Sequence, residues 1–209
     1  ARGFGDDVLR VFDSCGPGAF KGWDGKKATH IPPVATRTER IISYGPVRVI
    51  AEIEVTGWKY QNAELDMMTR YTLYAGHRDV EVDIRIDGAS PDATFCTGIQ
   101  KLERHSTGFM QENGLCGSWG NNVPEKSAPE HDEWVGLGLY TDKACRKEMK
   151  EDEFNYLTLL DTDADKHIRY YITVCARREK DGFKNSKAWF DHLRLWKTEL
   201  DNPCTVSIR

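Results

Sequence analysis

The feature that most constrains this fold is the alternation of apolar and polar residues along much of the chain. It is clearest at residues 80–87, where four apolar residues alternate with charged ones: Val80, Val82, Ile84 and Ile86. Successive side chains of a β-strand point to opposite faces of a sheet, so this pattern predicts a strand with one buried face. The charged positions between them predict that the other face is solvated.

Similar runs predict further strands. Weak alternation at Asp7–Asp13 indicates an early strand, and residues 47–56 place apolar side chains at odd-numbered positions. The even-numbered positions of that run, which include Glu52 and Glu54, are expected on a solvated face. Turn signals such as Gly45–Pro46 separate the runs. Other strands are expected at residues 37–43, 65–74, 95–104, 135–140, 156–160 and 168–175.

One helix is expected near the end of the sequence. Its apolar positions recur at spacings of four, three and four residues: Trp189, Leu193, Trp196 and Leu200. Asn185 or Ser186 can cap its first turn, and Pro203 ends it. Nine or more strands with one helix predict a mostly β protein, a large antiparallel β-sandwich that occupies residues 1–209 as a single domain.

Composition narrows the range of partners. The chain has 29 Lys and Arg residues against 33 Asp and Glu residues, a net charge of −4. Without a basic block, such a chain is a poor candidate for binding nucleic acid or an anionic membrane surface. Its apolar runs are only a few residues long, whereas a membrane-spanning helix needs about 20. We therefore expect no nucleic-acid partner and no membrane span.

The six cysteines leave two alternatives open. They lie at positions 15, 96, 116, 145, 175 and 204, and none forms a C-x-x-C pair. An even number permits three disulfides in an exported protein, whereas buried reduced thiols would suit a core. The chain starts at Ala1 without a Met, which suggests a trimmed product or part of a longer protein. We expect an exported protein, periplasmic or extracellular.

A candidate catalytic cluster lies in residues 96–105. If this segment is one strand, then Lys101, Glu103 and His105 share a face. A lysine, a carboxylate and an imidazole in this arrangement could supply a charge stabiliser, an acid and a base. The alternative is a solvated strand face with a surface salt bridge.

A second polar face lies in residues 66–74. There Arg70 could hold a sugar carboxylate through paired hydrogen bonds, with Tyr74 beside it. The alternative is an ordinary polar exterior.

Aromatic residues and one histidine complete the candidate binding set. Trp119 lies among glycines and Trp23 lies in a Gly-Trp-Asp-Gly turn, so either ring could form a platform on which a sugar stacks. The alternative is that these rings fold back onto the core. His30 precedes Ile31–Pro32–Pro33 in a loop from which it could reach a cleft, and the alternative is an ordinary surface or capping histidine.

Two acidic segments resemble metal sites only weakly. Residues 130–133 offer mixed ligands, and residues 161–165 resemble the start of a calcium loop. The second segment has Lys166 where the loop needs glycine and Ile172 where it needs glutamate. We therefore expect a turn there, no metal site and no cofactor.

Several motifs together resemble one known family. They are Asp7–Val11, Ser14–Ala19, Tyr44–Arg48, Gly98–Ile99 and Phe183–Trp189. They are similar to the domain-of-unknown-function family 4861, found in bacteria that degrade plant and algal polysaccharides and similar to galactose mutarotase-like proteins. The resemblance implies an antiparallel β-supersandwich with its site on the concave sheet. It assigns no catalytic residue, and the mutarotase arrangement of two histidines and a carboxylate is absent. Family members are usually longer at the N-terminus.

Together with the candidate residues, this resemblance implies a carbohydrate-active enzyme that acts on plant or algal polysaccharide fragments, such as a uronate-directed polysaccharide lyase. In that reading Arg70 or Lys101 neutralises the uronate carboxylate, and His105 or Tyr74 removes the proton at C5. Glu103 would orient His105. Two alternatives remain: a noncatalytic carbohydrate-binding module, and a structural domain that associates with a missing N-terminal portion or with a second copy.

Overall fold

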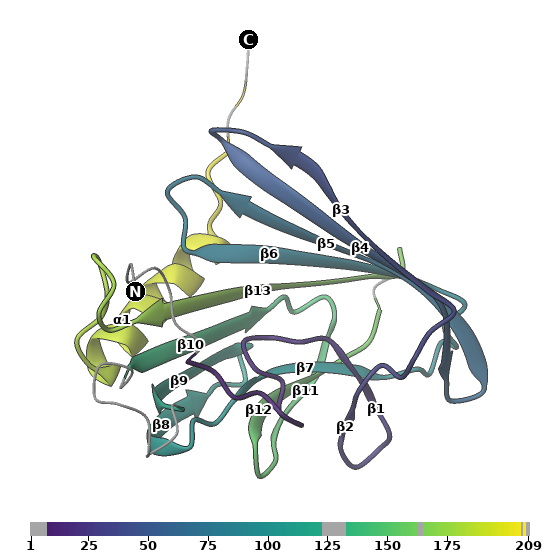
Figure 1. Ribbon diagram of the computed structural model, residues 1–209, viewed down its shortest axis with the longest axis horizontal. Helices are drawn as coiled ribbons and strands as arrows, with labels where there is room; N and C mark the ends of the chain where they lie inside the picture. The colour runs from purple at the N-terminus through teal and green to yellow at the C-terminus, as the bar shows by residue number, and fades with distance from the viewer. Residues whose placement is uncertain (1–7, 123–132, 163–164, 206, 208–209) are drawn as a thin grey trace, which may run out of the picture.

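The protein is a sandwich of two antiparallel sheets with one helix (Figure 1). The computed structural model describes residues 8–122, 133–162, 165–205 and 207. The larger sheet has the strand order β3-β4-β5-β6-β13-β10-β9-β8, and the smaller sheet has the order β11-β12-β7-β1-β2. The expected mostly β sandwich with one helix near the end of the sequence is confirmed.

The larger sheet consists of β3 (Thr36–Tyr44), β4 (Arg48–Tyr60), β5 (Ala63–Tyr74), β6 (Asp79–Asp87), β8 (Arg104–Met110), β9 (Leu115–Asn121), β10 (Trp134–Thr141) and β13 (His167–Ala176). The smaller sheet consists of β1 (Lys21–Trp23), β2 (Ala28–Thr29), β7 (Phe95–Gln100), β11 (Arg146–Glu151) and β12 (Asn155–Leu160). The helix α1 spans Ser186–Asp201.

The main core lies between the two sheets. Ile84 and Tyr170 from the larger sheet and Phe95 from the smaller sheet are all inaccessible to solvent and belong to one apolar cluster. The predicted strand at residues 80–87 is confirmed as β6, whose inner side chains Val82, Ile84 and Ile86 are fully buried. Burying one such side chain contributes about 1.5–3 kcal/mol.

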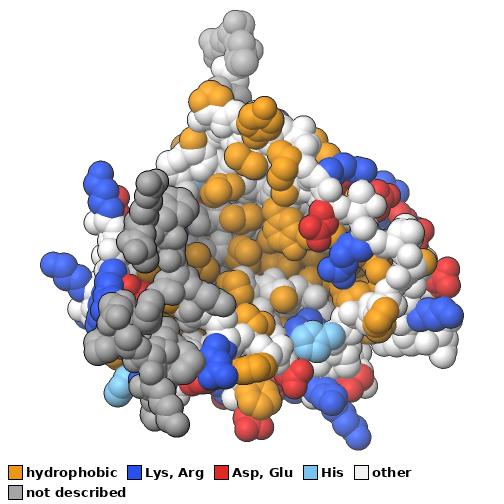
Figure 2. All heavy atoms as spheres, in the orientation of Figure 1, with side chains coloured by type: hydrophobic (Ala, Val, Ile, Leu, Met, Phe, Trp, Pro, Cys, Tyr) orange, Lys and Arg blue, Asp and Glu red, His pale blue; other side chains and the backbone are white. Residues whose placement is uncertain are grey.

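The larger sheet extends beyond the smaller one at β3, β4 and β5 (Figure 1). Its inner face is therefore only partly covered there, and Tyr44, Val49 and Leu73 remain exposed. The space-filling view shows a hollow on this side whose surface is largely hydrophobic (Figure 2). This hollow is the concave side of the molecule.

The predicted strand at residues 95–104 is wrong in its extent. β7 ends at Gln100, and the chain crosses to the other sheet before β8 begins at Arg104. All six residues of β7 are buried because the strand pairs with β1 and β12 inside the sandwich. Alternation cannot continue through a crossing between sheets, so positions on either side of the crossing no longer share a face.

Two further strand expectations are corrected. The described part of Asp7–Asp13 forms no strand, because the chain turns at residues 12–14 and Phe12 adopts a left-handed backbone conformation with φ 43°. The run expected at residues 47–56 does not end there, because strand β4 continues to Tyr60 through a bulge between Val55 and Trp58. Gly57 has φ 72°, a conformation that glycine tolerates best.

Helix α1 packs on the outer side of the larger sheet. The Asn185 side chain caps it by accepting a hydrogen bond from the Ala188 backbone N–H at 2.9 Å. Its buried side chains Trp189, Leu193 and Trp196 form a second apolar cluster, separate from the main core. The predicted helical stripe is thus confirmed, although Leu200 is only partly buried.

The cysteines are free thiols rather than disulfides. Cys15, Cys96, Cys116, Cys145 and Cys175 are buried, and Cys204 is exposed. Burial raises the pKa of the Cys15 thiol to about 12. Of the two alternatives that the sequence left open, the structure therefore has reduced thiols, five of them buried.

The two acidic segments, residues 130–133 and 161–165, are only partly described by the structure. Within the second, Asp161 pairs with Lys147, at 3.2 Å between Nζ and Oδ1. Residues 130–132 and 163–164 lie outside the described residues, and elsewhere in the described chain no group of three or more acidic, histidine or cysteine side chains is placed to hold a metal ion. In the same part of the chain, no helix combines the length and apolar character needed to cross a membrane.

Candidate functional site

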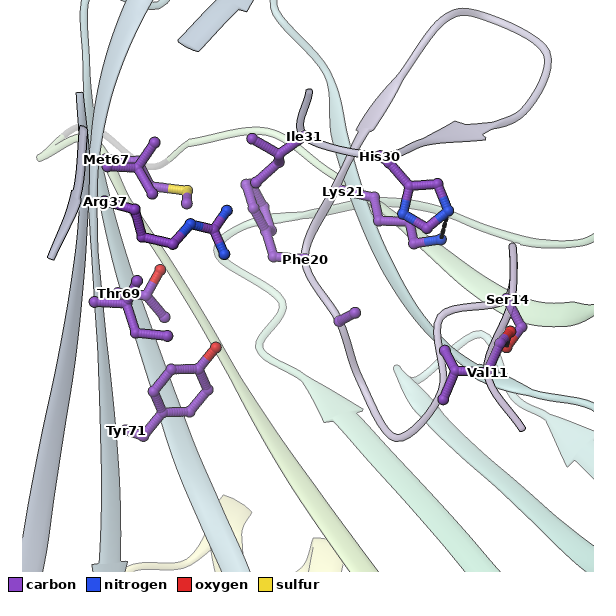
Figure 3. Close-up of a pocket in the computed structure, with 13 residues that line it drawn as sticks. Val11, Ser14, Phe20, Lys21, His30, Ile31, Arg37, Met67, Thr69 and Tyr71 are labelled. Carbon is purple, nitrogen blue, oxygen red and sulfur yellow. Dashed lines mark hydrogen bonds between the residues drawn. The ribbon is translucent and has the colours of Figure 1, made fainter. Parts of the chain in front are cut away.

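A cleft of about 380 Å³ lies on the concave side, between the inner face of β3–β5 and the chain segment that leads into and out of β1 (Figure 3). Its sheet wall carries Arg37, Thr69 and Tyr71 among apolar neighbours. Its opposite wall carries Lys21 and His30. Figure 3 shows Phe20 and Ile31 directed toward the sheet wall, whereas Lys21 and His30 extend from the same segment away from Arg37 and Tyr71. The cleft thus gathers titratable groups from two parts of the chain, a common feature of binding and catalytic sites.

Strand register explains why the sheet wall is assembled from three strands. Arg37 of β3 pairs with Val55 of β4, which pairs with Met67 of β5, so these three side chains form one row on one face. Thr69 and Tyr71 follow on β5 at intervals of two residues and therefore point to the same face. Figure 3 shows Arg37 and Tyr71 extending from the sheet into the cleft.

The opposite wall is built around a buried lysine. Lys21 is only 3% exposed, and its Nζ donates a hydrogen bond to the backbone carbonyl of Asp13 at 2.7 Å. The same Nζ lies 3.4 Å from His30 Nε2, and His30 Nε2 lies 3.3 Å from Asp13 Oδ1. A buried lysine charge is costly unless it is paired or hydrogen-bonded, so these contacts fix where the ammonium group lies.

The position of Asp13 depends on a tight turn. The Ser14 backbone N–H and hydroxyl both donate to the carbonyl of Val11, at 2.9 and 2.6 Å. The Gln100 side chain contacts the Ser14 hydroxyl at 3.1 Å and donates to the Arg10 carbonyl at 3.4 Å. These hydrogen bonds hold the turn against Gln100 at the end of β7. The Asp13 carbonyl thereby lies within hydrogen-bond distance of the Lys21 ammonium group.

His30 has a partner for either protonation state. A neutral imidazole can accept a hydrogen bond at Nε2 from the Lys21 ammonium group. A protonated imidazole can instead donate from Nε2 to the Asp13 carboxylate. This arrangement suits a group that takes up and releases a proton during a reaction.

The sheet wall supplies a cation and a phenol. The Arg37 side chain is exposed and forms no hydrogen bond or ion pair with another described residue, so its guanidinium group is available to an anionic ligand. Burial raises the pKa of the Tyr71 hydroxyl, an effect that Arg37 partly offsets. Tyr71 therefore stays protonated at neutral pH and can donate a proton or a hydrogen bond.

Only one residue of the predicted set, His30, lies in this cleft. Lys101 and Glu103 border a separate cleft of about 170 Å³ at the crossing between the sheets. Lys101 donates to the Asp152 carbonyl at 2.7 Å and pairs with Glu151 at 3.0 Å. These contacts tie Lys101 to the turn before β12.

His105 does not join Lys101 and Glu103 on a common face. It lies in the bulge of β8 between Arg104 and Thr107, with φ 51°. Its ring stacks on Trp134, with 5.3 Å between ring centroids. The expected same-face arrangement of Lys101, Glu103 and His105 is therefore wrong, because the strand it required is interrupted.

Arg70 and Tyr74 occupy the outer face of the larger sheet. Arg70 pairs in register with Glu52, and its Nη2 donates to Glu52 Oε2 at 2.9 Å. Tyr74 lies at the end of β5, with its ring 6.0 Å from that of His77. The concave cleft is on the other side of the sheet, so the structure does not bring Arg70 and Tyr74 to it.

The two tryptophans expected as sugar platforms are buried. Trp119 is 3% exposed and packs beneath α1, in the same apolar cluster as Trp189. Trp23 is also buried, with the Lys150 ammonium group 5.8 Å from its ring centre. The expectation that these rings are exposed is wrong. In β9, Gly117 has no side chain where Leu193 of the helix approaches, so α1 can cover the face that carries Trp119.

Three titratable residues of the cleft were not selected from the sequence: Lys21, Arg37 and Tyr71. For β5, the prediction took the more polar face, which carries Arg70 and Tyr74, as the candidate site. The sequence pattern that could have indicated the cleft is weaker than this polar face. Thr69 and Tyr71 interrupt the apolar face of β5 between Met67 and Leu73. Polar residues on the inner face of a strand mark a place where a core opens to solvent or ligand.

The sequence matches the family described as domain of unknown function (DUF4861) over residues 1–206. The chain belongs to this family. A search of curated proteins found no match. The membership agrees with the resemblance noted in the motifs, and it assigns no activity.

Proposed function

We propose that this DUF4861 protein is a carbohydrate-active enzyme that binds an acidic sugar of plant or algal polysaccharides in the concave cleft and cleaves the chain by β-elimination. The observation that carries the proposal is that one cleft is lined by Arg37 and Tyr71 from the sheet and by Lys21 and His30 from the segment around β1. These groups match the needs of a uronate lyase: a cation for the carboxylate, a base and an acid.

Each of these four residues has a role in this reaction. Arg37 binds the uronate carboxylate through paired hydrogen bonds and stabilises the negative charge that develops on it. His30 Nε2 gives up the hydrogen bond from Lys21 and removes the proton at C5. The electron pair of the C5–H bond forms the C4–C5 double bond as the C4–O glycosidic bond breaks. Tyr71 donates its proton to the leaving oxygen. Lys21 is a positioning residue that holds His30 and adds positive charge.

The charge of the cleft supports an acidic ligand. Its lining includes Lys21, His30 and Arg37 but no aspartate or glutamate among the described residues. The exposed guanidinium group of Arg37 attracts a carboxylate-bearing sugar and gives a neutral sugar no such advantage. Charge-assisted hydrogen bonds also orient the ring of the bound sugar.

The test is turnover of uronic-acid polymers, followed by the new ultraviolet absorbance of the unsaturated uronate product. We expect His30→Ala and Tyr71→Phe each to lower the rate by about 100-fold or more, the usual contribution of a positioned acid or base. Arg70→Ala is the matched control, because Arg70 lies on β5, the strand that carries Tyr71, but on the opposite face of the sheet.

Three other results would count against the proposal. Binding of uronic-acid oligosaccharides in the cleft without any unsaturated product would make the chain a noncatalytic binding module. Absence of binding would remove the saccharide proposal altogether. A loss of rate in Arg70→Ala equal to that in His30→Ala would move the site to the outer face.

A further inference from the structure

A second cleft adjoins the first on the far side of His30. It has a volume of about 470 Å³ and is bordered by Asp13, Lys27, His30, Phe154 and neighbouring residues. His30 also borders the first cleft, and the Asp13 carboxylate lies 3.3 Å from its Nε2. A ligand that binds beside His30 in the first cleft can therefore extend directly into the second.

Phe154 gives this second cleft an exposed aromatic ring. Its side chain is 51% exposed, although phenylalanine is normally among the most buried residue types. The turn that presents it is fixed by Asp152, whose Oδ1 accepts hydrogen bonds from the backbone N–H groups of Phe154 and Asn155 at 2.9 and 2.7 Å. The ring is thus held outward by a defined turn, where it offers a flat apolar face on which the C–H groups of a sugar can stack.

The second cleft has a different charge from the first. Three carboxylates border it, those of Asp13, Asp152 and Glu153. Lys27, which does not line the first cleft, contributes one positive charge. A uronate placed here would meet carboxylates at short range and be disfavoured. A neutral sugar has no such cost, and the carboxylate oxygens can accept hydrogen bonds from its hydroxyl groups.

We propose that the second cleft is a subsite for a neutral sugar unit, stacked on Phe154, that is joined to the acidic unit in the first cleft. This inference rests on the proposed function, because it takes the first cleft as the site of the uronate. It makes the substrate a polysaccharide in which acidic and neutral sugars are linked, and it disfavours a polymer of uronate alone.

The test compares the affinity of the intact chain for four probes by titration calorimetry. The probes are glucuronic acid, a glucuronic acid–xylose disaccharide, a disaccharide of two glucuronic acids and xylobiose, with no C4 substituent on any uronate so that elimination cannot occur. We expect the mixed disaccharide to bind about five-fold more tightly than glucuronic acid, the gain of one stacked ring. The disaccharide of two uronates should bind no more tightly than glucuronic acid.

Two variants and one control test the residues. Phe154→Ala should remove the five-fold gain of the mixed disaccharide while the affinity for glucuronic acid is unchanged. Glu153→Lys should raise the affinity for the disaccharide of two uronates. Leu195→Ala, which removes an exposed apolar side chain of α1, should change none of these affinities.

The outcomes separate this inference from the proposed function. Retention of the full gain in Phe154→Ala, or tighter binding of two uronates than of the mixed disaccharide, would overturn the neutral subsite and leave the uronate site standing. If glucuronic acid fails to bind and no unsaturated product forms, the proposed function fails. Xylobiose binding that is lost in Phe154→Ala would then still support a neutral-sugar site.

Discussion

Glu52 and Arg70 form an ion pair on the outer face of the larger sheet, with Arg70 Nη2 2.9 Å from Glu52 Oε2. The Glu52 carboxylate is almost fully buried, and it also accepts a hydrogen bond from Arg40 Nε at 2.9 Å. The Arg70 hydrogen bond holds the pKa of Glu52 below its usual value. The arginine that sequence analysis chose for substrate binding therefore neutralises a buried carboxylate of the fold.

We predict that Arg70→Ala destabilises the fold without impairing the concave cleft. The free energy of unfolding should fall by about 1–2 kcal/mol, since a hydrogen bond to a charged group is lost while Arg40 still pairs with Glu52. Because the folded-state pKa of Glu52 is lowered, this stabilisation is present above its ordinary pKa and is lost as the pH falls through the lowered value. Urea unfolding at neutral and acid pH measures both effects. Equal stability of variant and native chain at neutral pH would contradict the prediction.

We predict that Gly136→Ala loosens α1 from the sheet. A Cβ atom at this position would lie 2.7 Å from the Trp189 ring and 2.7 Å from Cys175 Sγ. Trp189 cannot simply rotate away, because its Nε1 donates to the Leu137 carbonyl at 3.2 Å. Overpacking of this kind costs about 1–3 kcal/mol. Gly45→Ala is the matched control, since no atom lies within 4 Å of its added Cβ, and thermal unfolding compares the two.

We predict that the protein loses stability at alkaline pH. Burial raises the pKa of the Cys116 and Cys175 thiols to about 12 and raises that of the Tyr170 hydroxyl well above its usual value. Above the ordinary thiol pKa of 9.0, the unfolded chain releases these protons while the folded chain keeps them, so stability falls as the pH rises. Each group contributes up to about 1.4 kcal/mol per pH unit.

The urea concentration at the midpoint of unfolding, measured between about pH 8 and 11, reports this loss. This pH range spans the ordinary thiol pKa and stays below the raised values of the folded chain. Tyr170→Phe should reduce the slope at the alkaline end, although it also removes the hydrogen bond to the Gly18 carbonyl at 3.0 Å. A midpoint that does not change with pH would show that these groups ionise equally well in both states.

We predict that one thiol reacts rapidly with a thiol reagent in the native chain and that all six react after denaturation. Cys204 is exposed, whereas the other five are buried with no disulfide partner. Cys204→Ser should abolish the rapid phase and leave five thiols that react only on unfolding. Fewer than six reactive thiols in denaturant without reductant would indicate disulfides and contradict the structure.

The alternation of residues was enough to predict most strands, and the stripe of Trp189, Leu193 and Trp196 was enough to predict the helix. Both patterns reflect local geometry, because side-chain direction repeats every two residues in a strand and every 3.6 in a helix. Errors came where long-range packing overrides that geometry. Lys101 and His105 were placed on one face because nothing local marks the point at which the chain leaves one sheet for the other.

The candidate site depended on tertiary structure much more than the elements did. The sequence by itself determined that β5 has two faces and that His30 lies in a loop before prolines. Only the packing of the two sheets decided which face of β5 is concave, and it favours Tyr71 over Arg70. It also decided that the turn at Asp13 contacts Lys21. A buried ammonium group needs a hydrogen-bond acceptor, and here the acceptor is the Asp13 carbonyl, which no local sequence pattern links to Lys21.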